Sequence, residues 1–177
     1  MKKYIFLFLI SFSVDTVENT PCNSNEEIIF SCRSHDKTIS ICASNEKQYI
    51  HYLFSNKNNL ELDAPNKNHQ NSKDFFRVFY AYGPGLQSYM TFKQGKFNYY
   101  IYSDYGDDSF SETGLKMSSA FDANGVVVLK DSRVVTHLKC STVNTRLSEQ
   151  SLKSLKLKSD DDIKHQQIYF DARVDLK

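Results

Sequence analysis

Four cysteines are the residues of this 177-residue chain with the most definite chemistry. They are Cys22, Cys32, Cys42 and Cys140. An even number of cysteines in an exported chain predicts two disulfides, for which three pairings exist. A zinc site is the competing interpretation, because His137 lies three residues before Cys140. No C-x-x-C pair accompanies it, so we expect disulfides and no metal.

A run of acidic residues between positions 104 and 112 is the second candidate for chemistry. Asp104, Asp107, Asp108 and Glu112 could supply oxygen ligands to Ca²⁺. Their spacing does not match the calcium loop of an EF-hand, which favours a solvated turn. A carboxylate pair from the same run could instead hydrolyse a glycosidic bond, provided that the fold sets the two groups at the required separation.

Recognisable catalytic motifs are missing from the sequence. It contains no G-x-S-x-G elbow, no H-E-x-x-H motif and no phosphate-binding glycine loop. The five histidines are scattered along the chain and form no known constellation. We therefore expect no catalytic residue and no cofactor.

Aromatic residues are dense between positions 75 and 105. The chain has 11 Tyr, 13 Phe and no Trp, and many of the rings fall in this block. The Phe-rich positions predict a core, whereas Tyr combines apolar area with a hydroxyl group and also suits an exposed interface. The surface that we expect to bind a partner consists of Tyr99, Tyr100, Tyr102, Asp104, Tyr105, Asp107 and Asp108.

The first thirteen residues are typical of a secretory signal peptide. Lys2 and Lys3 precede an apolar run over residues 4–12, which is too short to cross a bilayer as a helix. Ser11 and Ser13 are small residues at the spacing that a signal peptidase prefers. We expect cleavage after Ser13, a single β-rich domain over residues 14–177, and a periplasmic or secreted location.

Net charge and hydropathy narrow the class of partner. The formal net charge is +1, so bulk electrostatics favour neither nucleic acid nor an anionic membrane. No further segment is long and apolar enough to be a transmembrane helix. The expected partner is therefore another protein, in the envelope or outside the cell.

Alternation of apolar and polar residues predicts a chain built from strands. Residues 147–157 fit either a short amphipathic helix or alternating strand, and residues 168–176 alternate almost perfectly, which predicts a C-terminal hairpin over 153–176. The fold class is all-β, an antiparallel sandwich or partly open barrel of roughly eight to ten strands. The other strands are expected over 28–32, 38–42, 49–54, 60–62, 75–82, 89–93, 97–103, 126–130 and 134–139, with loops over 63–73 and 104–112.

The register of the first hairpin bears on the disulfide pairing. Joining the apolar faces of residues 28–32 and 38–42 sets Cys32 opposite Ile39 and directs Cys42 to the other side of the sheet. A bond between Cys32 and Cys42 would require a different register. A slip of one residue turns every side chain of a strand to the other face of the sheet, so the apolar faces would no longer meet. The pairing of Cys32 with Cys140 and of Cys22 with Cys42 fits better.

Several short segments resemble small exported proteins of Gram-negative bacteria. They are EEIIFSC at 26–32, KTISIC at 37–42, YLF at 52–54, LEL at 60–62 and a hairpin from GVVV at 125–128 to LKC at 138–140. The resemblance covers residues 22–140. It implies export and a β-rich architecture, and it carries no assigned activity.

Export, small size and surplus tyrosine together indicate a non-catalytic binding protein. Periplasmic lysozyme inhibitors and immunity proteins are comparable in size, export and β content, so an inhibitor or immunity-type partner of an envelope-active enzyme is the leading hypothesis by analogy. The alternatives are an envelope glycan hydrolase that uses an Asp/Glu pair, and a surface protein that self-associates through the edge of its C-terminal strand.

Overall fold

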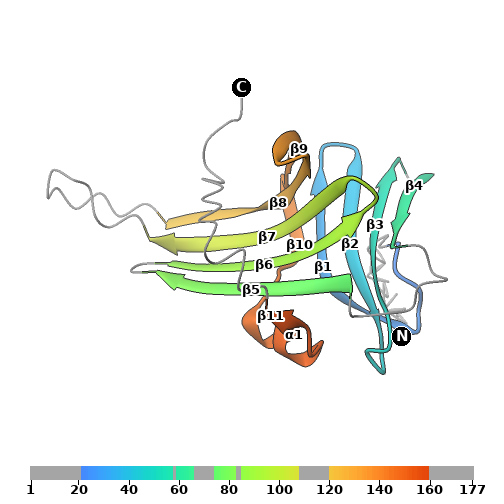
Figure 1. Ribbon diagram of the computed structural model, residues 1–177, viewed down its shortest axis with the longest axis horizontal. Helices are drawn as coiled ribbons and strands as arrows, with labels where there is room; N and C mark the ends of the chain where they lie inside the picture. Colours follow the sequence, from blue (N-terminus) through green and yellow to red (C-terminus); the bar gives the residue numbers. More distant parts are fainter. Residues whose placement is uncertain (1–20, 58, 66–73, 83–84, 108–119, 160–177) are drawn as a thin grey trace, which may run out of the picture.

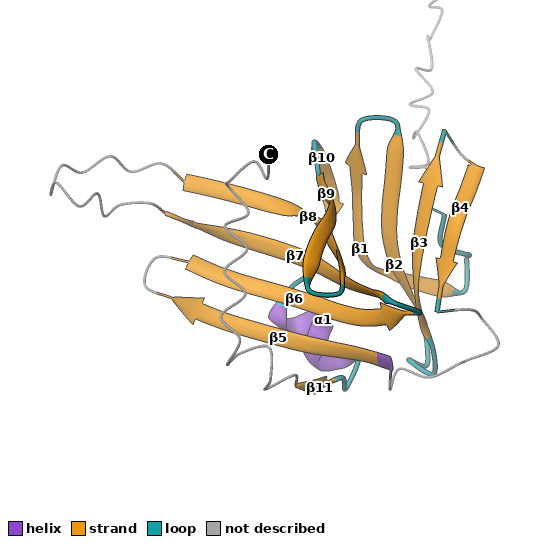
Figure 2. Ribbon diagram, turned by 45° about the horizontal axis from the view of Figure 1, so that its top comes forward, coloured by secondary structure: helices purple, strands orange, loops and turns teal. Residues whose placement is uncertain are grey.

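The computed structural model describes residues 21–57, 59–65, 74–82, 85–107 and 120–159, and of residues 80, 82 and 107 only the backbone. Two sheets make up this part of the chain, and their strands run at a steep angle to each other (Figures 1 and 2). Sheet A has the order β10-β1-β2-β3-β4, and sheet B has the order β11-β5-β6-β7-β8-β9. The expected all-β, sandwich-like fold is confirmed: the described residues form eleven strands, against the roughly eight to ten expected, and no closed barrel.

The elements follow one another mostly as antiparallel hairpins. Sheet A contains β1 (Glu26–Ser34), β2 (Lys37–Ser44), β3 (Ile50–Asn56), β4 (Asn59–Ala64) and β10 (Thr142–Thr145). Sheet B contains β5 (Phe75–Tyr82), β6 (Gly85–Gln94), β7 (Phe97–Asp107), β8 (Ala120–Lys130), β9 (Arg133–Lys139) and the short β11 (Lys158–Ser159), which pairs in parallel with β5. The one described helix is α1 (Glu149–Ser154).

Local sequence explains the tight turns of sheet B. Asp131 and Ser132 join β8 to β9 and both have positive φ, at 50° and 63°. A two-residue turn of this kind matches the right-handed twist of the flanking strands, and Asp tolerates the conformation well. Gly95, with φ at 59°, occupies the turn between β6 and β7. Both hairpins lie where the sequence pattern predicts them.

The main core lies between the two sheets. Its buried side chains come from β1 to β4 on one sheet and from β5 to β8 on the other, together with four leucines around α1. Burying each such aliphatic or aromatic side chain contributes about 1.5–3 kcal/mol. This core includes Phe30, Ile39, Ile41, Phe75, Met90, Ile101, Leu147, Leu152, Leu155 and Leu157.

Helix α1 resolves the ambiguous stretch over residues 147–157. Ser148 caps it, because its side chain accepts a hydrogen bond from the Ser151 backbone N–H while the Ser151 side chain bonds back to Ser148. Leu152 then points into the core. The helix includes the first two residues of the stretch where a hairpin over 153–176 was expected, and the strand predicted over 168–176 lies outside the described residues.

One long strand passes from sheet B to sheet A. Strand β9 pairs with β8, and after Cys140 and Ser141 the chain continues as β10, which pairs with β1. The backbone N–H of Cys140 donates to Asn124, and that of Ser141 donates to Arg33. Cys140 therefore lies at the junction of the two sheets.

The described part of the chain contains no helix that is long and apolar enough to cross a membrane.

Candidate functional site

Both predicted disulfides are present, and no cysteine is free. Cys22 pairs with Cys42 across 20 residues, and Cys32 pairs with Cys140 across 108 residues, with Cα–Cα distances of 5.6 Å and 5.7 Å. The hairpin register agrees, because Cys32 lies opposite Ile39. In the disulfide-bonded form Cys140 has no thiolate with which to bind zinc.

The expected tyrosine surface is divided between the two faces of β7. Tyr99 faces the main core, where its ring stacks on Phe92 with centroids 4.7 Å apart. Tyr100 and Tyr102 point to the opposite face and join a second apolar cluster with Tyr89 and other residues of sheet B. Tyr102 is only 1% exposed, so the middle of β7 is a strand that is buried on both faces.

Strand β7 also continues through the start of the expected acidic loop. Asp104 is 4% exposed and accepts a hydrogen bond from the Gln87 side chain at 3.0 Å, so the expectation of a solvated turn at this residue is wrong. Tyr105 is 43% exposed. The side chain of Asp107 and all of Asp108 lie outside the described residues.

The side chain of Tyr102 contacts residues of both β8 and β9. Its hydroxyl lies 2.9 Å from His137 Nε2, and its ring crosses Gly125, the residue opposite it on β8. A Cβ at Gly125 would lie 2.2 Å from the Leu138 carbonyl oxygen and 2.8 Å from the Tyr102 hydroxyl. Burial, and next the charge of Asp104, raise the pKa of Tyr102. The hydroxyl is thus a buried, neutral structural group.

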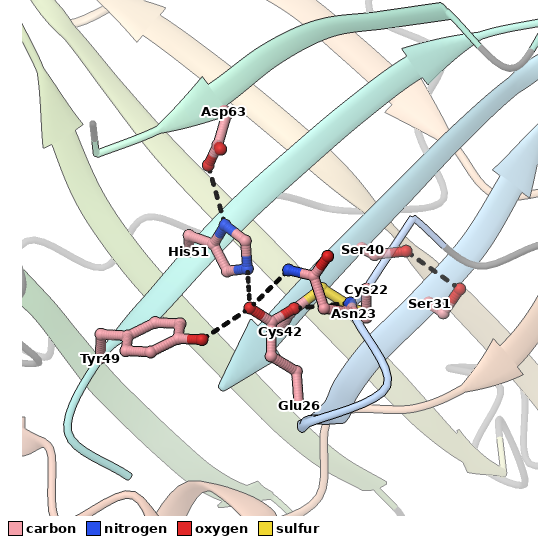
Figure 3. The surroundings of a disulfide bond; sticks show 9 residues. All are labelled: Cys22, Asn23, Glu26, Ser31, Ser40, Cys42, Tyr49, His51 and Asp63. Atoms are coloured by element: carbon pink, nitrogen blue, oxygen red, sulfur yellow. Dashed lines mark hydrogen bonds and ion pairs between the residues drawn. A yellow bond between two sulfur atoms is a disulfide. The ribbon is translucent and has the colours of Figure 1, made fainter. Parts of the chain in front are cut away.

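A cluster of titratable side chains that the sequence did not reveal lies beside the Cys22–Cys42 disulfide (Figure 3). His51 on β3 is its centre: Nδ1 lies 2.8 Å from Asp63 Oδ1, and Nε2 lies 3.2 Å from Glu26 Oε1. The side chains of His51 and Glu26 are 3% and 1% exposed. A buried imidazole therefore separates two carboxylates.

Glu26 has most of its hydrogen-bonding capacity filled within the chain. It accepts bonds from the backbone N–H and the side-chain amide of Asn23 at 2.8 Å and 3.0 Å, and from the Tyr49 hydroxyl at 2.8 Å. Burial raises the pKa of this carboxyl, but the bonds from Asn23 and Tyr49 and the charge of His51 outweigh it and hold the pKa at about 2. The bond to Glu26 in turn raises the pKa of Tyr49.

The Glu26 carboxyl of this cluster is suited to a structural role. General acid catalysis near neutral pH needs a carboxyl with a raised pKa, whereas that of Glu26 is lowered. Cys22, Glu26 and Cys42 also present ligand atoms within 4.8 Å of one another. The two sulfurs are joined to each other, so they cannot bind a metal as thiolates. The cluster fastens the segment before β1 to β3 and β4.

Exposed apolar side chains gather at the opposite end of β7 from Tyr105. Phe97 at the start of β7 is 37% exposed, and Val134 and Val135 on β9 are 39% and 51% exposed. The strand register places Phe97, Lys130 and Arg133 side by side on one face of this end of the sheet. Val134 lies opposite Leu129, on the face that carries the second apolar cluster. Lys130 Nζ also lies over the Phe97 ring, 5.8 Å from its centroid.

We call this region the cationic tip. Four exposed cations surround its apolar residues, against one exposed carboxylate in the same two turns, Asp131. It comprises Lys93, Lys96, Phe97, Lys130, Arg133, Val134 and Val135, which belong to the adjacent hairpins β6–β7 and β8–β9. This region was not predicted from the sequence, because its residues are spread over as many as 42 positions. Isolated exposed valines also give no periodic signal. The signal that could have found it is the concentration of Lys and Arg around two predicted turns.

Comparisons of this chain with protein-family models, with curated proteins and with solved structures gave no match.

Proposed function

We propose that this chain is a non-catalytic exported binding protein, an inhibitor or immunity-type partner of an envelope-active enzyme. The observation that carries the proposal is the cationic tip, where Phe97, Val134 and Val135 remain exposed on a sheet whose other large apolar side chains are mostly buried. Interface energy concentrates in a few apolar and aromatic anchors surrounded by polar groups. The tip has this composition.

The scaffold supports the same role. The Cys32–Cys140 bond joins β1 to the junction between the sheets, and Cys22–Cys42 fastens the segment before β1. A braced two-sheet frame holds surface residues in one arrangement, which lowers the entropy lost on binding. The two disulfides are compatible with an oxidising compartment, and with the expected leader over residues 1–13 they support a periplasmic or secreted location.

The proposed contact surface is the tip rather than the middle of β7. Tyr102 and Asp104 are buried, and Tyr99 packs against the main core, so these residues cannot act as anchors without opening the sheet. Of the originally expected surface, Tyr105 is exposed. It lies eight residues from Phe97 on the same strand, about 26 Å away.

The hydrolase alternative now depends on residues outside the described part of the chain. The titratable cluster around His51 does not support it, because the low pKa of Glu26 makes this carboxyl unsuited to the role of general acid. Asp107 and Glu112 remain the candidates for a carboxylate pair. Self-association through a strand edge is the third hypothesis.

Photo-crosslinking in a Gram-negative periplasm tests the binding role. A benzophenone amino acid is introduced at Phe97 in one variant and at Tyr105 in another, which matches the two sites in ring size, strand and exposure. We expect one discrete adduct with an envelope-active enzyme from position 97, and none from position 105. Turnover of peptidoglycan by the purified chain, abolished by Asp107→Asn or Glu112→Gln, would instead establish the hydrolase.

A further inference from the structure

We infer that the open edge of β9 accepts a short, extended, acidic segment of a partner protein as an added strand. This inference rests on the proposed binding role and specifies the chemistry of the contact. Three features of the described residues lead to it: an unpaired strand edge, a neutral β-branched sequence along that edge, and the cations around it.

The edge is open because the neighbouring strand ends too early. In the long strand formed by β9 and β10, the β10 part pairs with β1, and β1 ends at Ser34. Within the described residues, β9 pairs with β8 alone (Figure 2). Every second residue of such an edge directs its backbone N–H and C=O outward, where an extended peptide can bond to them.

The residues along this edge do little to prevent pairing. Natural edge strands are guarded by lysine, proline, inward-pointing charge or a bulge, and of these guards the stretch over residues 134–136 has the bulge alone. Val134, Val135 and Thr136 are exposed, uncharged and β-branched, which favours strand pairing. The pairing of β9 with β8 has a bulge at this level, where Leu129 faces Val134 and Val128 faces Thr136. A bulge increases twist, so the added strand is short, about three or four residues.

The positive charge near this edge favours an acidic segment of a partner over a second copy of this chain. Arg133 begins β9, Lys130 lies opposite it on β8, and Lys96 precedes Phe97, which lies opposite Lys130 on β7. Asp131 is the single carboxylate in these two turns. A second copy of this chain would bring its own cationic tip to the same place, and like charges oppose that pairing. A segment that carries Asp or Glu between apolar residues matches both the cations and the valines.

A defined peptide tests strand addition. The probe is a fluorescein-labelled heptapeptide of alternating glutamate and valine, titrated into the intact protein and followed by anisotropy. Its first control has the same sequence with alternate backbone nitrogens methylated, which keeps the charge and removes strand pairing. The second control replaces glutamate by lysine. We expect at least tenfold weaker binding of both controls.

Protein variants test the cations. The double variant Lys130→Glu, Arg133→Glu should bind the acidic peptide at least tenfold more weakly. The double variant Lys57→Glu, Lys158→Glu makes the same change in net charge at exposed sites outside the tip and should bind like the wild type. Hydrogen exchange should slow at the amides of residues 134–136 when the unmethylated peptide is added.

Five results would overturn the inference. The first is equal affinity for the methylated and unmethylated peptides. The second is slow exchange, in the free monomer, at those amides of residues 134–136 that point away from β8, which would mean that this chain already covers its own edge. The third is a concentration-dependent dimer that protects these amides, and the fourth is binding to phosphatidylglycerol vesicles without binding to the peptide. A partner crosslinked at Phe97 that leaves these amides unprotected would refute strand addition and leave the binding role intact.

Discussion

Replacing Glu26 by glutamine tests whether the cluster around His51 stabilises the fold. Glutamine has the shape of a protonated carboxyl and lacks the negative charge that faces His51 at 3.2 Å. The pKa of Glu26 falls from 4.5 to about 2 in the folded protein. One pKa unit corresponds to about 1.4 kcal/mol, so the ionised carboxylate contributes at most about 3 kcal/mol to the free energy of unfolding.

The sign of this contribution fixes its pH dependence. Because the folded pKa is lower than the unfolded one, the stabilisation is complete above pH 4.5 and disappears as the pH falls toward 2. We therefore expect Glu26→Gln to lower the free energy of unfolding by about 3 kcal/mol at pH 7, and by less than about 1 kcal/mol at pH 2.5.

Urea unfolding of the disulfide-intact proteins at both pH values measures the difference. Glu61→Gln on β4 is the matched control, since this glutamate is exposed, and it should change stability by less than about 0.5 kcal/mol. Equal stability of Glu26→Gln and the wild type at pH 7 would refute the reasoning. A loss that stays the same in acid would also refute it, because the charge of Glu26 would then not be its cause.

Two further substitutions test the packing and the covalent frame. Gly125→Ala should destabilise the protein by about 1–3 kcal/mol in chemical denaturation, because the added Cβ would clash with the Leu138 carbonyl oxygen. Adding Tyr102→Ala should not restore stability, since the carbonyl oxygen remains in place. If Gly125→Ala is as stable as the wild type, the strands can move apart. Cys140→Ala should cost about 1.5 kcal/mol more than Cys22→Ala in the same assay, because the two loops span 108 and 20 residues; the reverse order would show that loop entropy does not dominate.

The hairpins and the disulfides could be predicted because their signals are local. Alternation in residues 28–42 has one pairing that buries both apolar faces, and this register directs Cys32 and Cys42 to opposite sides of the sheet. The register excludes a bond between Cys32 and Cys42 and leaves two pairings, of which the structure contains Cys22–Cys42 with Cys32–Cys140. Turn residues such as Asp131 and Ser132 mark hairpins equally locally.

The exposure of the tyrosines could not be predicted, because a strand that is buried on both faces shows no alternation. Tyr100 and Tyr102 point away from the main core, yet both belong to a second apolar cluster. Only Gly125 hinted at this arrangement, since a glycine within a strand often permits the close approach of a neighbouring ring.

The cluster around His51 was missed because its members come from different elements. Glu26, His51 and Asp63 lie on β1, β3 and β4, and Asp63 was expected in a loop. Their proximity depends on the order of sheet A, which places β3 between β2 and β4. Consecutive hairpins give that order, but the expected loop over residues 63–73 removed Asp63 from the strand that faces His51.

The most direct test of the binding role measures how substitutions at the two exposed ends of β7 change the affinity for the partner that is crosslinked at Phe97. That partner, once purified, is titrated against Phe97→Ser, Val135→Ser and against Tyr105→Ser, with folding verified by thermal unfolding. We predict at least tenfold weaker binding for the first variant, equal to about 1.4 kcal/mol, and unchanged affinity for the second. Unchanged affinity of the first variant, or a larger loss in Tyr105→Ser, would contradict the assignment of the interface to the cationic tip.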